Sequence, residues 1–228
     1  MNKHAVQHER TPPKQSESSK KSSLERLALS LSSLDSSATS PSLSPLRLPL
    51  PESTLSWSMF LSSSIGWCSM LPPTSQLSTA DKKILFENSW HTLFINSTFT
   101  HFGFATLMNN LEVKDSASVA LEKIKMVCSF MEELKLNTLE QWCINIILLY
   151  RPEDSRFADS SLIRNIQMQS ALLLAECQDS SSDLTRARGV SVSLILPSLA
   201  QISQDDVRSV FFPDKTLADM AKLCRDAL

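Results

Sequence analysis

The chain has 228 residues, enough for one sizeable domain and a tail. A net charge of −2 argues against polyanion binding through bulk electrostatics, and 3 glycines argue against a glycine-rich phosphate loop or a turn-dense β-sandwich. The 5 cysteines are odd in number and contain no Cys-x-x-Cys pair, which argues against a zinc site of closely spaced thiols and favours a reducing compartment.

The first 50 residues differ from the rest of the chain. Residues 11–50 are dominated by Ser, Pro, Lys and isolated leucines, a composition that predicts a disordered hinge. Leucines at 24, 27, 31 and 34 have helical spacing and predict a short, loosely docked amphipathic helix. The polar N-terminus does not have the pattern of a signal peptide, and the longest apolar run, residues 144–150, is too short to span a bilayer.

From about residue 53 the hydrophobic pattern predicts helices. The first ends at Pro72-Pro73, because proline cannot continue a helix. Ser78 and Asp81 have capping-box spacing and predict the start of a second helix that is apolar nearly all round. Residues 102–107 are aromatic and include Gly103, which predicts a small β-hairpin.

The second half of the chain continues this pattern. Residues 116–135 carry a helical apolar stripe, Asn137 is a predicted cap, residues 139–150 predict a buried central helix, and residues 162–176 predict another helix. Residues 190–196 alternate like a strand, although a longer helical spacing also fits and Pro197 disfavours a helix. Local propensity leaves strand and helix about equal there. Ser203 caps a following turn, and a final amphipathic stretch ends the chain.

Two groups of residues carry a family resemblance. Their order and spacing are those of the signature of nuclear receptor ligand-binding domains and of a late helix of that family: Trp67, Pro72, Leu77, Asp81, Leu85, Trp90 and Leu93, then Gly189, Leu194, Leu196, Pro197 and Leu199. The resemblance implies an all-α, three-layer helical sandwich over residues 51–228, with a helix and not a strand at 190–196.

A second resemblance narrows the family. Residues 1–10, MNKHAVQHER, are similar to the segment that directly follows the last zinc-ligand cysteine in receptors of the tailless and photoreceptor-specific type. It implies a chain that begins just downstream of a zinc-finger DNA-binding domain, so that contact with DNA would need zinc fingers absent from this chain.

The resemblance also implies binding sites. A coregulator groove would involve Ile65, Ser69, Lys82, Lys83, Glu87, Leu223 and Asp226. The family has a lysine where Ser69 stands, and that lysine contacts the carboxyl end of a coregulator helix, so half of the usual charge clamp is lost here or displaced to Lys82 or Lys83. Residues 223–228 fit the activation-helix pattern, with Asp226 as its acid.

The resemblance also implies a ligand pocket and a dimer helix. A tentative pocket for a lipophilic ligand includes Trp90, Phe94 and His101, although the tryptophan is better explained as a core aromatic and the histidine as a surface or hairpin-capping residue. A dimer helix would include Gly189, Val192, Leu196 and Leu199. No catalytic residues, metal site or cofactor are expected, and no enzyme activity.

The expected function is transcriptional regulation in the nucleus, with repression as its output. The expected partners are coregulator helices and a second receptor chain in a homo- or heterodimer, and no membrane. The alternative is a helical carrier of lipid-like small molecules, or a scaffold, that is not a transcription factor.

Overall fold

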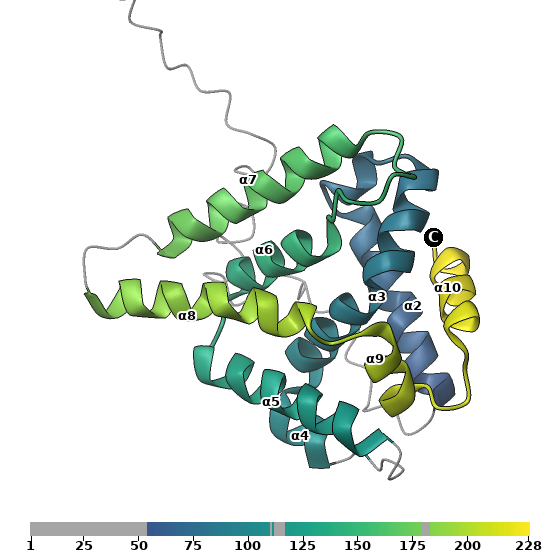
Figure 1. Cartoon of the computed structure of the whole chain (residues 1–228), viewed down its shortest axis with the longest axis horizontal. Coiled ribbons are helices and arrows are strands. Elements are labelled where there is room, and N and C mark those ends of the chain that lie inside the picture. The colour runs from purple at the N-terminus through teal and green to yellow at the C-terminus, as the bar shows by residue number, and fades with distance from the viewer. Residues whose placement is uncertain (1–53, 110, 112–116, 179–182) are drawn as a thin grey trace, which may run out of the picture.

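The computed structural model describes residues 54–109, 111, 117–178 and 183–228, and all regular structure in these ranges is helical (Figure 1). The predicted hinge, the leucine-patterned segment at 24–34 and the receptor-like residues 1–10 lie outside them. The helices are α2 (Thr54–Met70), the 3-10 helix η1 (Thr74–Gln76), α3 (Thr79–Phe102), α4 (Phe104–Asn109), α5 (Ser118–Leu134), α6 (Thr138–Leu149), α7 (Ser160–Gln178), α8 (Asp183–Ala200), α9 (Gln204–Phe211) and α10 (Leu217–Asp226).

The helices stack in layers around α3 and α6. Helix α3 packs against α2 and α10 on one side and against α6 on the other, and α6 packs in turn against α7 and α8 (Figure 1). Helix α5 packs against α8 and α9. This is the helical sandwich that the resemblance implied.

Local sequence signals set most helix boundaries. Ser78 accepts a hydrogen bond from the Asp81 backbone N–H, and complete capping boxes begin α6 at Asn137, α9 at Ser203 and α10 at Thr216. Helix α2 ends just before Pro72-Pro73. The caps predicted at residues 78, 137 and 203 are therefore confirmed.

The predicted β-hairpin at residues 102–107 is wrong, since the structure describes no strand there. Helix α3 continues to Phe102, and the Gly103 N–H still donates to the Phe99 carbonyl at 2.8 Å. Gly103 then has a φ of 75° and redirects the chain into α4. A glycine at positive φ serves a helix C-terminus as readily as a hairpin turn, so the local pattern suited both.

The segment at 190–196 is helical, within α8. Val192, Ile195 and Leu199 are fully buried and recur every three or four residues, so a helix places all of them in the core whereas a strand would divide them between two faces. Pro197 lies in the last turn of α8. In the described part of the chain, no helix combines the length and the hydropathy needed to cross a bilayer.

Candidate functional site: the surface covered by helix α10

Helix α10 lies across the two helices that the resemblance assigned to a coregulator groove. It packs against both α2 and α3 at the edge of the fold (Figure 1). Met220 and Cys224 are fully buried and Leu223 is half-buried, which gives α10 an apolar stripe at helical spacing. Burial raises the pKa of the Cys224 thiol to about 12, so this side chain behaves as a small apolar group.

The end of α10 is placed by contacts with α2. A Cβ atom added to Gly66 would lie 3.7 Å from the Ala227 carbonyl oxygen, so the two backbones approach closely there. Ile65, the residue before Gly66, is fully buried. The C-terminal turn of α10 therefore lies against α2.

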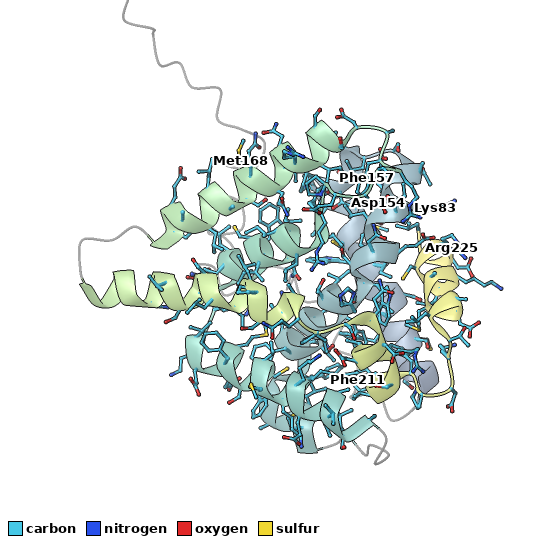
Figure 2. The ribbon with its side chains drawn as sticks, in the orientation of Figure 1. Lys83, Asp154, Phe157, Met168, Phe211 and Arg225 are labelled. Atoms are coloured by element: carbon cyan, nitrogen blue, oxygen red, sulfur yellow. The ribbon has the colours of Figure 1, made fainter. Side chains whose placement is uncertain are left out.

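An ion pair joins α10 to α3. Arg225 Nη1 lies 2.6 Å from Glu87 Oε1, across 138 residues of sequence. The other carboxylate oxygen, Oε2, faces Arg156 Nη1 at 3.7 Å. Figure 2 labels Arg225 on α10 and Asp154 on the loop between α6 and α7.

Arg156 is itself held by other partners. Its Nη2 and Nε atoms contact the Asp154 carboxylate at 2.6 to 3.1 Å, and Asn88 Nδ2 donates to the same carboxylate at 2.8 Å. The hydrogen bonds from Arg156, then from Asn88, hold the pKa of Asp154 far below its usual value. Gln204 of α9 donates to the backbone carbonyls of Glu87 and Asn88 at 3.0 and 3.1 Å. These hydrogen bonds fix the position of α3 at Glu87 and Asn88.

Ser69 and Lys82 lie close together where α2 and α3 meet. The Ser69 hydroxyl donates to the Gly66 carbonyl at 2.8 Å, and the Ser69 carbonyl accepts from Lys82 Nζ at 3.4 Å. Lys83 and Asp226 are exposed. The structure places Ile65, Ser69, Lys82, Lys83 and Glu87 on α2 and α3, whereas Leu223 and Asp226 belong to the covering helix α10.

The predicted ligand-pocket residues lie in or beside an aromatic cluster. Trp90 and Phe94 are almost fully buried. Phe94 packs on Phe211 and Phe212 with ring centroids 5.0 and 5.2 Å apart, and Trp90 lies 5.9 Å from Phe212. His101 is half-buried and packs on Phe60 and Phe102. These rings form aromatic contacts within the core.

The residues named for the dimer helix face mainly inward. Gly189 is buried, Val192 and Leu199 are fully buried, and Leu196 is half-buried, so their side chains serve the core of one chain. The exposed apolar side chains of α8 are Val190, 63% exposed, and Leu194, 54% exposed. The pattern of 190–196 did not reveal which face was which.

The structure contains a groove that the sequence did not indicate. An open groove of about 830 Å³ lies between α6, α7, α8 and α9. Its lining includes Arg151 and Glu153 on the loop after α6, Gln167 on α7, and Leu196 on α8. The lining residues come from five helices (α3, α6, α7, α8 and α9) and from the loop after α6, so no local motif could have indicated the groove.

Comparison with known proteins supports the fold. No protein-family model matches the sequence. Among solved structures, the Ultraspiracle ligand binding domain from Drosophila melanogaster is similar over 90% of this chain and 96% of that chain, with a TM-score of 0.56 and 20% sequence identity. At that identity the likeness concerns the fold, and the fold of this chain is that of a nuclear receptor ligand-binding domain.

Proposed function

We propose that this chain is a nuclear receptor-type regulator of transcription that acts in the nucleus through coregulator helices and dimerisation, with repression as its output. The observation that carries the proposal is the position of α10. An amphipathic helix already covers the surface between α2 and α3, with its apolar stripe inward. A surface that accepts one such helix has the apolar floor that a partner helix needs. A partner helix binds there when α10 moves away.

The test measures peptide binding to the full chain. Met220→Lys places a charge in the buried stripe of α10 and should release this helix. A fluorescent Leu-x-x-Leu-Leu peptide should then bind the variant more tightly than the unmodified chain in fluorescence polarisation. Met126→Lys, at a 74% exposed position on α5, is the matched control and should change nothing. If neither the folded variant nor the unmodified chain binds any such peptide, the proposal fails.

A second measurement concerns the altered clamp. Ser69→Lys should tighten peptide binding several-fold at most, because a partly exposed charge at a helix end contributes about 0.3–1 kcal/mol. The Lys82 ammonium, near the Ser69 carbonyl, already supplies part of that charge. A Lys82→Ala variant should therefore gain more from Ser69→Lys than the unmodified chain does. Equal gains would show that Lys82 has no part in the groove.

Repression is tested separately. Fused to a heterologous DNA-binding domain, the chain should lower expression of a reporter gene in cells.

The chain alone should not bind DNA sequence-specifically in a gel-shift assay at physiological salt. Tight sequence-dependent binding by the isolated chain would contradict the expectation that contact with DNA needs separate zinc fingers.

A further inference from the structure

Helix α10 is a template for the partner that its surface accepts. Its inward side chains are Met220, the half-buried Leu223, and Cys224, at positions i, i+3 and i+4, which is the spacing of apolar residues in a Leu-x-x-Leu-Leu helix. The next residue, Arg225, makes the ion pair with Glu87. The template therefore reads apolar-x-x-apolar-apolar, followed at once by a cation.

Glu87 depends on that cation. Its side chain is only 19% exposed, and Arg225 Nη1 is its nearest cationic atom at 2.6 Å. Arg156 is farther away, at 3.7 Å, and its guanidinium is held by Asp154. When α10 moves away, Oε1 of Glu87 loses its direct cationic partner, and the carboxylate faces the vacated surface, where a cation on an incoming helix can take the place of Arg225.

Resting on the proposed function above, we infer that Glu87 is the specificity determinant of this surface. It selects partner helices that carry Arg or Lys directly after the apolar pair, and it disfavours an acid at that position. The partner class is thus a basic-flanked coregulator helix. The selection acts through the attraction of opposite charges and through the unfavourable approach of a second carboxylate.

The test uses three peptides that differ only at the residue after Leu-x-x-Leu-Leu: Arg, Ala or Glu. Binding is measured by fluorescence polarisation on the full chain carrying Arg225→Ala, which weakens the competing α10. The Arg peptide should bind roughly five- to tenfold more tightly than the Glu peptide, a range typical of a charge-assisted contact at a partly exposed site. With Glu87→Lys added, the order should reverse.

The matched control is Glu122→Lys on α5, which alters an exposed ion pair with Lys125 and should leave the order of the peptides unchanged. Equal affinity for the Arg and Glu peptides, or an order that does not respond to Glu87→Lys, would overturn the specificity role while leaving the coregulator function intact. If none of the three peptides binds the folded Arg225→Ala chain, the coregulator function fails, and the role of Glu87 fails with it.

A measurement without peptides tests the same pair. Hydrogen exchange of α10 should accelerate in Glu87→Lys and in Arg225→Glu, and slow again in the double charge exchange. No recovery in the double variant would mean that the 2.6 Å contact does not hold α10 in place. Helix α10 would then not be a template for the partner helix.

Discussion

Glu140 shows how one carboxylate becomes stable in the interior. It is only 1% exposed, and Arg188 of α8 contacts both of its oxygens. Burial raises the pKa of Glu140, but the hydrogen bonds from Arg188 and from the Asn137 backbone outweigh that effect, and the pKa lies below its usual value. The pair thus fastens α8 to the start of α6.

Removing the cation should leave this carboxylate buried and unpaired. We expect Arg188→Met to lower the free energy of unfolding by about 2 kcal/mol, less than for a fully buried pair because the Arg188 side chain is 37% exposed. Urea denaturation measures the change. Arg208→Met, which removes a pair with the 66% exposed Asp205, is the control and should cost well under half as much. Equal losses would contradict this account.

His91 predicts a dependence of stability on pH. Burial, then repulsion from Arg151, lowers the pKa of His91 to about 4, with Asp206 opposing them. Its Nδ1 atom is buried without a hydrogen-bond partner in the described part of the chain. Because the folded-state pKa lies below the unfolded value near 6.5, the stability contributed by the neutral ring is complete above pH 6.5. It is lost as the pH falls toward 4.

The measurement is the urea midpoint of the native chain and of His91→Leu between pH 7.5 and 4.5. The native chain should lose more stability than the variant across this range, by up to roughly 2–3 kcal/mol at its acidic end. Parallel losses in the two proteins would exclude His91 as the cause.

At the scale of elements, the joint between α3 and α4 depends on one glycine. Gly103 has a φ of 75°, and a Cβ atom added there would meet nothing within 4 Å. With a ψ of 163°, Gly103 lies in a backbone region that is essentially restricted to glycine, so Gly103→Ala should cost about 1–3 kcal/mol through backbone strain alone, measured by thermal or urea unfolding. Lys135, a non-glycine residue with a φ of 47° at the end of α5, is the reverse case. Lys135→Gly should not destabilise the chain, and a loss equal to that of Gly103→Ala would contradict the explanation.

The outer surfaces of α7 and α8 carry exposed apolar side chains suited to a dimer interface. Val190 and Leu194 on α8, and Met168 and Leu172 on α7, are all more than half exposed. Figure 2 shows Met168 on the outer side of α7. A second copy of this chain, or another receptor, would remove these side chains from water.

We expect Val190→Asp with Leu194→Asp to give a folded monomer, and sedimentation velocity at tens of micromolar would report it. Val192→Arg should instead unfold the chain, because Val192 is fully buried. A native chain that is already monomeric at these concentrations would disprove dimerisation through α8.

Features that act over only a few residues could be predicted from the amino-acid sequence. Pro72-Pro73 ended a helix, and Ser78, Asn137 and Ser203 began helices, because each effect involves backbone groups within about four positions. The residues around Trp67 and Trp90 also indicated a helical sandwich, although the small β-hairpin expected with it is absent from the described residues.

Features that depend on how the helices pack could not be predicted from the sequence. Residues 102–107 became helical ends and not a hairpin, because among the described residues no strand could pair with them and support a hairpin. The inward face of α8 was set by its packing against α5, α6 and α7. The contact between Glu87 and Arg225 joins positions 138 residues apart, and it forms only because α10 docks against α3. Local patterns carry no information about such distances, because they arise when whole helices bury their apolar faces against one another.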